Sequence, residues 1–277
     1  MTLVAEQAPD KTPDRIAGMF DAIAPRYDLL NHLLSAGIDR RWRTKMIASL
    51  KLTGRDTLVD VCTGTADVAL EARRGAQGNP HHSTAARVVG VDFAGAMLAL
   101  GLRKVRDAGE AQHIALVRGD AMQIPVADGI ADAATVAFGV RNVQKIDVAV
   151  RELARVLRPG GRLAILEFSI PRIPGLAALY RWYFSSVLPL IGRAISGHSG
   201  AYSYLPASVG AFPPPGEFVT LLRHSGFTDV RAVPLTFGIV YLYAAVRDRP
   251  TTIGQPYVVM SGSAVGLRMP EAGGRLL

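Results

Sequence analysis

The sequence of 277 residues contains a single cysteine, Cys62. One cysteine excludes an intramolecular disulfide and a cysteine-rich zinc site, and it favours a reducing compartment such as the cytoplasm. Charged residues make up only 19% of the chain, against 49% hydrophobic residues. This composition excludes disorder of the whole chain, because ample apolar material is present for a core.

The sequence also has no clean apolar run of the ~20 residues that a membrane-spanning helix needs. Residues 1–20 contain three acidic side chains, which argues against a secretory signal peptide. The most apolar stretch of the second half, residues 173–195, is interrupted by Arg181 and Arg193. We therefore expect no spanning helix and a cytoplasmic protein.

Acidic residues are fewer than basic ones, and the formal net charge is +8. Residues 11–55 contribute most of it, with nine Lys or Arg against four Asp or Glu. This excess is compatible with a nucleic acid, an anionic membrane surface or another acidic partner. It is equally compatible with a basic protein that binds none of these.

Three zones are predicted along the chain. Residues 1–55 have an amphipathic, helical pattern and form an N-terminal cover. Residues 56–249 form the main domain, with an aromatic-rich lid insertion at about 171–215. Residues 250–277 have weak periodicity and several glycines, and we expect a poorly ordered tail.

Short apolar runs alternate with helical patterns in the main domain. Strands are expected at residues 57–62, 87–91, 114–117, 131–138 and 162–168. Helices are expected at residues 67–74, 97–107 and 148–157, the last stopped by the Pro-Gly-Gly run at 159–161. Strands separated by helices predict an α/β fold with a mostly parallel sheet.

Polar and glycine residues follow three of these strands. Asp60 and Gly64 lie around the first strand end, Asp92 ends the second strand, and Asp120 follows the third. Ligands of parallel sheets bind beyond the carboxyl ends of the strands, where such carboxylates accept hydrogen bonds from ribose hydroxyls and an adenine amino group. The alternatives are an ordinary turn at Gly64 and a helix N-cap at Asp92. Three such ends together predict a nucleoside site, and the absence of a three-glycine pattern argues against a dinucleotide.

Several motifs resemble a known family. They are MFDAIAPRYD at residues 19–28, SAGID at 35–39, FGVRNV at 138–143, LEFS at 166–169, YSYL at 202–205 and LTFGIV at 235–240. Together with the LRPGGRL turn at 157–163, the chain resembles the C-methyltransferases of ubiquinone and menaquinone biosynthesis. This resemblance implies a class I S-adenosylmethionine-dependent methyltransferase, Rossmann-like, with a mostly parallel seven-stranded sheet.

The resemblance also assigns residues to the cofactor. Those implied are Asp60, Gly64, Thr65, Asp92, Asp120, Ala121 and Ala137. Two departures from the family stand out: Ala137 replaces a frequent serine, and Thr63 and Ala66 stand where glycine is frequent. The form of the first turn is closer to that of menaquinone-type members. The implied reaction is therefore methylation of demethylmenaquinol to menaquinol, with the ubiquinone-pathway 2-methoxy-6-polyprenyl-1,4-benzoquinol as an alternative acceptor.

The acceptor is a poor nucleophile until a phenolic proton leaves its ring. By resemblance, Arg141 steadies the developing phenolate and Asn142 orients a water that relays the proton. The alternative is that both residues only anchor their loop. Tyr27, Asn31, Tyr202 and Tyr204 are expected to line the quinol pocket, or else to pack and cap helices.

The expected partner is a prenylated quinol, approached by peripheral contact with a membrane, and the choice between monomer and homodimer stays open. No metal site and no nucleic-acid platform is expected. Two rivals remain: a methyltransferase acting on RNA or a small metabolite, and an inactive cofactor-binding scaffold.

Overall fold

The computed structural model describes residues 10–35, 37–74, 85–171 and 199–249, together with positions 173, 175, 178, 182 and 186. The side chains of residues 25–34 and 199–203 lie outside this description. So do residues 250–277, for which a poorly ordered tail is predicted, and most of the predicted lid. Across the described residues, no helix is long and apolar enough to cross a membrane.

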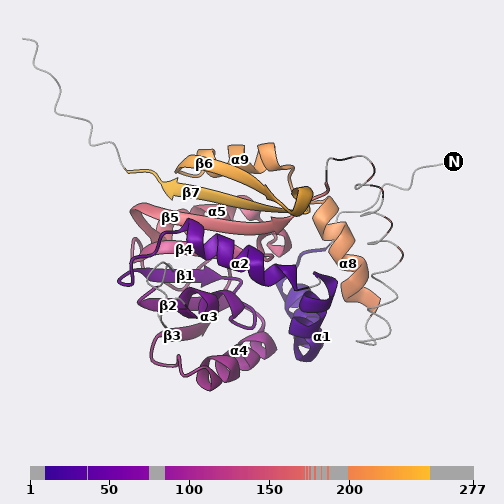
Figure 1. Cartoon of the computed structure of the whole chain (residues 1–277), viewed down its shortest axis with the longest axis horizontal. Coiled ribbons are helices and arrows are strands. Elements are labelled where there is room, and N and C mark those ends of the chain that lie inside the picture. The colour runs from indigo at the N-terminus through magenta and orange to yellow at the C-terminus, as the bar shows by residue number, and fades with distance from the viewer. Residues whose placement is uncertain are drawn as a thin grey trace, which may run out of the picture.

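A seven-stranded sheet forms the centre of the molecule, in the order β3-β2-β1-β4-β5-β7-β6 (Figure 1). The strands are β1 (Thr57–Val61), β2 (Arg87–Asp92), β3 (Ile114–Arg118), β4 (Ala131–Ala137), β5 (Leu157–Phe168), β6 (Phe227–Leu235) and β7 (Val240–Arg247). The first five pair in parallel, and β7 runs antiparallel to β5 and β6. The order reverses between β1 and β4, which is where such sheets bind ligands.

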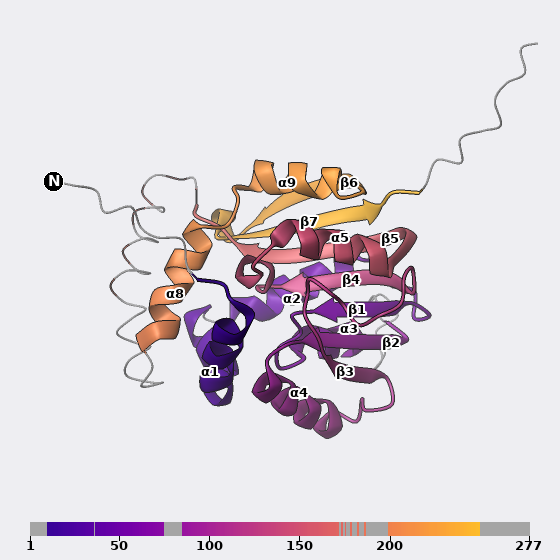
Figure 2. The same ribbon diagram turned by 180° about the vertical axis from the view of Figure 1, so that it is seen from behind.

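Helices cover both faces of this sheet. One face carries α2 (Ile38–Ser49), α3 (Asp67–Arg74) and α4 (Gly95–Asp107). The other carries α5 (Ile146–Val156) and α9 (Pro215–His224), which are in front when the molecule is viewed from behind (Figure 2). Each face has its own apolar core, and β1 supplies both: Leu58 packs with α2 and α3, whereas Val59 packs with α5. The near-continuous apolar strands follow from this two-sided burial.

Two further helices, α1 (Pro13–Leu34) and α8 (Ser199–Gly210), lie beyond the carboxyl end of the parallel strands (Figure 1). They contact each other, and α1 also packs on α4. The short helices η2 (Val140–Asn142) and η4 (Thr236–Gly238) lie at the same end. This end is therefore where the strand termini, the N-terminal helix and α8 converge.

One sequence boundary is wrong. The Pro-Gly-Gly run at 159–161 was expected as a turn before a strand at 162–168, but β5 already begins at Leu157, which pairs with Ala131. The ladder then shifts register before Ala133 pairs with Arg162. Gly160 has a φ of 78°, a backbone conformation that glycine adopts without steric cost, so the run forms an irregularity inside the strand pair.

Candidate functional site

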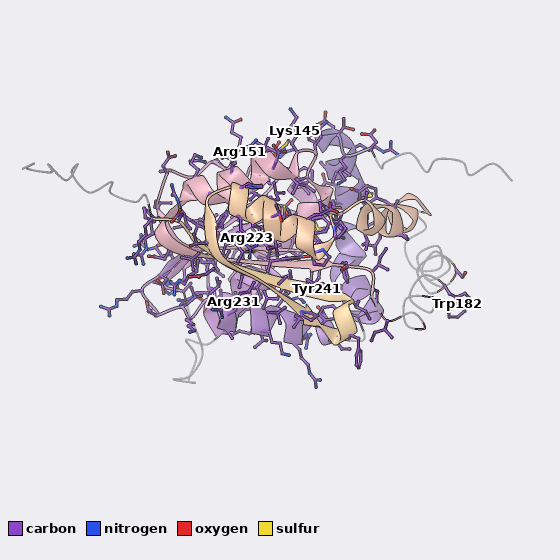
Figure 3. All side chains as sticks on the ribbon, turned by 90° about the horizontal axis from the view of Figure 1, so that it is seen from above. Lys145, Arg151, Trp182, Arg223, Arg231 and Tyr241 are labelled. Carbon is purple, nitrogen blue, oxygen red and sulfur yellow. The ribbon has the colours of Figure 1, made fainter. Side chains whose placement is uncertain are left out.

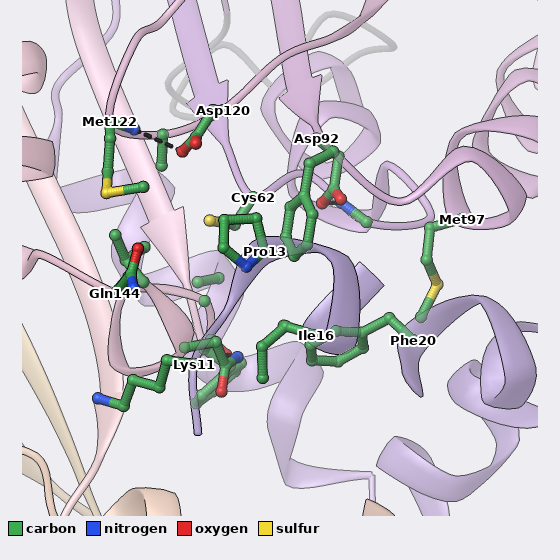
Figure 4. Close-up of a pocket in the computed structure, with 18 residues that line it drawn as sticks. Lys11, Pro13, Ile16, Phe20, Cys62, Asp92, Met97, Asp120, Met122 and Gln144 are labelled. Carbon is green, nitrogen blue, oxygen red and sulfur yellow. Dashed lines mark hydrogen bonds between the residues drawn. The ribbon is translucent and has the colours of Figure 1, made fainter. Parts of the chain in front are cut away.

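A cavity of about 660 Å³, open to solvent, lies beyond the carboxyl ends of β1, β2, β3 and β4. Its walls are mainly apolar, with carboxylates of Asp92 and Asp120 among them (Figure 4). The segment before α1 and the first turns of α1 close the opposite side, with Lys11, Pro13, Ile16 and Phe20. An apolar cavity with a few convergent polar groups suits a small organic ligand.

Asp92 ends β2 and holds the turn after β1. Its Oδ2 accepts the Gly64 N–H at 2.8 Å, and its Oδ1 accepts the Ala94 N–H at 2.9 Å. Burial raises the pKa of this carboxyl above its usual range, although these backbone donors oppose the rise. Asp92 is not the N-cap of α4, which is Ala94. A carboxylate offers about four lone-pair positions, so acceptor capacity remains for a ligand.

Gly64 lies beside Asp92 in the cavity wall. Its φ is 55°, and a Cβ placed on it would meet no atom within 4 Å. The missing side chain therefore leaves room for a ligand to approach the backbone.

The third strand end supplies the other carboxylate. Asp120 accepts the Met122 N–H at 2.8 Å, which fixes the turn (Figure 4). Ala121 and Ala137 also line the cavity. Of the residues that the sequence assigns to the cofactor, the structure thus brings together Gly64, Asp92, Asp120, Ala121 and Ala137.

Asp60 and Thr65 lie behind the wall and are not among the residues that line the cavity. The Asp60 carboxylate is 1% exposed and accepts the hydroxyls of Thr63 at 2.6 Å and Thr135 at 2.7 Å. Thr65 Oγ1 accepts from the Lys104 ammonium at 3.2 Å. Both residues therefore stabilise the turn, and their placement disfavours contact between their side chains and a ligand in the cavity.

The backbone at the cavity floor is strained. Cys62, Ala66 and Phe138 have φ values of 56°, 66° and 58°, in the left-handed region that non-glycine residues seldom adopt. Gly139 sits against Cys62 so closely that an added Cβ would lie 2.3 Å from the Cys62 Cβ. Such strain persists only where the surroundings impose it, and it often marks a ligand site.

Arg141 and Asn142 form η2, directly after the Phe138-Gly139 turn. The Arg141 guanidinium donates from Nη1 to Glu167 Oε1 at 2.7 Å, and the Arg141 N–H donates to Glu167 Oε2 at 3.2 Å. Glu167 is fully buried, and the guanidinium carbon lies 5.4 Å from the centre of the Phe168 ring. Asn142 lines the cavity, whereas Arg141 does not. The Glu167 pair agrees with the anchoring alternative for Arg141.

Within the part of the chain that the structure describes, three buried polar atoms near η2 lack a hydrogen-bond partner: Arg141 Nε, Asn142 Oδ1 and Tyr204 Oη. Buried polar atoms are normally paired, so three in one region point to groups that a ligand or ordered water satisfies. Burial raises the pKa of the Tyr204 phenol. The other predicted pocket residues cannot be placed, because the side chains of Tyr27, Asn31 and Tyr202 lie outside the described residues.

Lys11 and Glu167 were not predicted from the sequence. Burial lowers the pKa of Lys11, and the nearby Arg141 charge lowers it further, while Glu167 opposes the change. Lys11 lies before α1 and carried no motif, so no local pattern could identify it. Glu167 stands inside the LEFS motif at residues 166–169 and was detectable there as a buried strand carboxylate.

The donor set fits S-adenosylmethionine rather than a metal. Two carboxylates stand at neighbouring strand ends among apolar side chains, as ribose hydroxyls and a flat base require. Burial raises the pKa of the Cys62 thiol, and the negative charges of Asp92, Asp60, Glu167 and Asp120 raise it further. Asp92 and Asp120 place acidic side chains in the wall of the cavity, which suits a sulfonium cation. Within the described residues, no group of His, Cys, Asp and Glu side chains could hold a metal ion.

Comparison with known proteins agrees with this geometry. The model of the ubiE/COQ5 methyltransferase family matches residues 8–247. The chain belongs to this family. A relative from Syntrophotalea carbinolica, named ubiquinone/menaquinone biosynthesis C-methyltransferase UbiE, is 49% identical over 84% of this chain and 94% of its own length. The demethylmenaquinone methyltransferase of Thermus thermophilus is 45% identical over 84% of this chain and all of its own.

Solved structures share the fold at low identity. A protein described as an S-adenosyl-L-methionine-dependent methyltransferase from Methanococcus maripaludis has a TM-score of 0.58 at 18% identity, covering 84% of this chain and 96% of that one. The [4+2]-cyclase SpnF has a TM-score of 0.61 at 17% identity, covering 86% and 96%. Since SpnF is named for a different reaction, the fold alone does not decide the chemistry.

Family membership does decide its class. The protein is an S-adenosylmethionine-dependent C-methyltransferase of quinone biosynthesis. The predicted family, fold class and cofactor are confirmed, and the rivals acting on RNA or serving as a scaffold lose their support.

Proposed function

We propose that the enzyme methylates a ring carbon of demethylmenaquinol, the reduced quinone, to give menaquinol. The observation that carries this proposal is the single cavity wall that joins a nucleoside-type site at Asp92 and Asp120 to unpartnered polar atoms at η2. The names of the relatives favour a menaquinone-type or ubiquinone-type acceptor. When bound, S-adenosylmethionine supplies an electrophilic methyl group.

The donor end of the cavity holds and orients the cofactor. Asp92 accepts the ribose hydroxyls, and Asp120 and the Ala121 backbone receive the base, while Gly64 leaves room beside the sugar. Asp60 and Thr65 act as positioning residues, because they fix the turn without facing the cavity. The lining separates residues that face the cavity from those behind it, and the assignment of the ribose to Asp92 and of the base to Asp120 comes from the family resemblance.

The acceptor end removes a phenolic proton. Asn142 Oδ1 is a buried acceptor on the cavity wall, and it suits the quinol O–H or a water that relays its proton. With the methyl donor bound, the O–H electron pair would move into the ring, the ring carbon would take the methyl group, and S-adenosylhomocysteine would leave with the electron pair of the former S–CH₃ bond. The ring carbon then loses its hydrogen as a proton while the ring oxygen is reprotonated, which restores the aromatic quinol.

Charge at this end favours the phenolate. Arg141 is compensated by Glu167 at 2.7 Å, whereas Lys11 has no ion pair among the described residues. Lys11 therefore supplies the net positive charge at the mouth, and Arg141 keeps η2, and with it Asn142, in place. Cys62 stays a neutral thiol because its pKa is raised, so it does not compete for the methyl group.

The test uses purified enzyme with a short-tailed demethylmenaquinol kept reduced, and methylated product is measured by mass spectrometry. Product from the quinol and none from the oxidised quinone is expected, because only the quinol has a phenolic proton to lose. Asn142→Ala should lower kcat with little change in cofactor affinity, and Lys11→Met should do the same, with partial rescue by Lys11→Arg. Equal loss of cofactor affinity in these folded variants would contradict the assignment.

The second acceptor is tested in the same assay. The relative from Syntrophotalea carbinolica carries both pathways in its name, so the ubiquinone-pathway 2-methoxy-6-polyprenyl-1,4-benzoquinol is offered in competition with demethylmenaquinol. A higher kcat/KM for the benzoquinol would transfer the proposal to that substrate. Because either acceptor carries an isoprenoid tail, we further propose peripheral contact with a membrane surface.

A further inference from the structure

An exposed aromatic side chain stands at the same end of the molecule as the cavity. Phe237 lies in η4 between β6 and β7 and is 75% exposed, the largest exposed fraction among the large apolar side chains described. Burial of a phenylalanine is worth about 1.5–3 kcal/mol, so leaving one in water forgoes a substantial gain. Its exposure calls for a reason outside the folded core.

The backbone around Phe237 adopts a conformation that non-glycine residues disfavour. Thr236, Phe237 and Gly238 have successive φ values of 45°, 58° and 85°, all left-handed. Such a conformation is an outlier for a bulky or β-branched residue. Strain in the turn that displays the aromatic ring points to a function for the display.

The turn is also hydrogen-bonded to helix α2. The buried Trp42 of α2 donates from Nε1 to Thr236 Oγ1 at 2.9 Å. The Trp42 ring packs against Phe138 at 6.0 Å and Phe168 at 6.3 Å between centres. Phe138 lines the cavity. One aromatic cluster therefore joins the displayed Phe237 to the cavity wall.

A second apolar residue stands next to η4. The Ser169 N–H donates to the Ile239 carbonyl at 2.9 Å, which places the end of β5 beside the turn. The following residue, Ile170, is 41% exposed. Phe237 and Ile170 thus form an apolar tip at the carboxyl end of the sheet.

Basic side chains flank this tip on α2. Arg41 and Lys45 are exposed and lie one turn apart on one face of the helix, next to the Trp42 position that binds η4. The one acidic residue of α2, Asp39, is buried and paired with Arg43. Among the described residues, the surface therefore combines a protruding apolar tip with two cations outside any ion pair, the combination that binds the headgroup region of an anionic bilayer.

We propose that Phe237, Ile170, Arg41 and Lys45 form the surface by which the enzyme docks on an anionic lipid bilayer. This Phe237 surface inserts its apolar tip at the level of the headgroups while the α2 cations meet the lipid phosphates. The cavity then faces the bilayer, from which a lipid-borne acceptor enters. The inference rests on the proposed function only for the identity of that acceptor.

The test is co-sedimentation of the full chain with vesicles of phosphatidylcholine alone or mixed with phosphatidylglycerol. The wild type should bind the anionic vesicles, and binding should weaken with added salt. Phe237→Asn replaces the aromatic ring with a side chain that tolerates the left-handed backbone. It should lower the constant for partition onto anionic vesicles about 10-fold or more. Phe237→Trp should retain binding. Arg41→Glu with Lys45→Glu should lower it at least about 10-fold and abolish the salt dependence.

Matched controls come from elsewhere on the molecule. Ile130→Ser removes an apolar side chain that is 54% exposed at the opposite end of the sheet, before β4. Arg151→Glu with Arg223→Glu makes the same charge change on α5 and α9, on the opposite face (Figure 3). Both controls should bind vesicles like the wild type. Equal losses in the controls, or unaltered binding by Phe237→Asn, would overturn the proposal.

Two further measurements distinguish lipid docking from self-association and from loss of catalysis. If Phe237 covers a second copy of the chain, Phe237→Asn will change the oligomeric state in sedimentation velocity without affecting vesicle binding, and the proposal fails. Methylation of a water-soluble, short-tailed quinol should be unchanged in Phe237→Asn, whereas methylation of a vesicle-embedded quinol should fall about 10-fold. If no quinol is methylated but the vesicle results hold, the proposed function fails and the docking surface stands.

Discussion

Asp60 makes the stability of this enzyme depend on pH in a direction opposite to that of most carboxylates. It is 1% exposed, and burial raises its pKa from 3.8 to about 7, even though the Thr63 and Thr135 hydroxyls favour the ionised form. In the unfolded chain the same carboxyl ionises near its ordinary value. The folded state therefore holds a proton that the unfolded state has released between these two pKa values.

Rising pH consequently destabilises the folded state across this range. As pH rises above 3.8, the unfolded chain gains stability by ionising while folded Asp60 does not, so the free energy of unfolding falls until pH passes about 7. At 1.36 kcal/mol per pKa unit, the full loss is about 4 kcal/mol, more than half of which falls between pH 5 and pH 8. Asp60→Asn removes the titrating group and keeps a side-chain oxygen for one hydroxyl.

Urea unfolding at both pH values measures this effect. Between pH 5 and pH 8 the wild type should lose about 2–3 kcal/mol more of its free energy of unfolding than Asp60→Asn does. Taking the difference between the two proteins cancels the contributions of all other titrating groups. Thr135→Val serves as a control: it removes one donor to Asp60, so it should destabilise more at pH 8, about 1.5–3 kcal/mol, than at pH 5, about 0.5–1.5 kcal/mol. Parallel pH profiles for wild type and Asp60→Asn would refute the reasoning.

Three other predictions concern the cavity wall. Asp92→Asn should weaken S-adenosylmethionine binding about 10- to 150-fold in calorimetric titration of folded protein, since hydrogen bonds to a charged acceptor are lost; unaltered affinity would remove Asp92 from the site. Glu167→Gln should lower the free energy of unfolding by about 3 kcal/mol because it leaves the buried Arg141 charge uncompensated. Adding Arg141→Met to Glu167→Gln should recover that stability while turnover stays low. Turnover that also recovers would show that the role of Arg141 is purely structural. Gly139→Ala should cost about 1–3 kcal/mol through its clash with Cys62, and Cys62→Gly in the same chain should relieve it, as thermal unfolding of the double mutant would show.

Much of the architecture could be predicted because the strands are apolar on both faces. Residues 57–61 form β1 as a short buried run, and the carboxylates at the next two strand ends lie where the parallel topology predicts. The start of β5 could not be predicted, because a Pro-Gly-Gly run has the composition of a turn. Only the long-range pairing of Leu157 with Ala131 makes it part of a strand.

Site residues at the end of a single strand could be predicted from the sequence, whereas residues brought to the site from distant segments were harder to predict. Asp92 and Asp120 needed only local sequence. Lys11 belongs to the wall because the chain before α1 folds back over the sheet, and no periodicity encodes that contact. Thr65 carried a family motif, yet its hydroxyl accepts from Lys104 on α4, a long-range contact that only the fold provides.

The Cys62 thiol offers a built-in probe of cavity occupancy. It is the sole cysteine of the chain, it lines the cavity, and its pKa is raised well above the usual range by burial and neighbouring carboxylates. An alkylating reagent reacts with the thiolate, so labelling should be slow at neutral pH and should speed up as pH rises. The labelling rate is followed by intact mass without any engineered residue. Saturating cofactor should slow it further, because a ligand in the cavity covers the thiol.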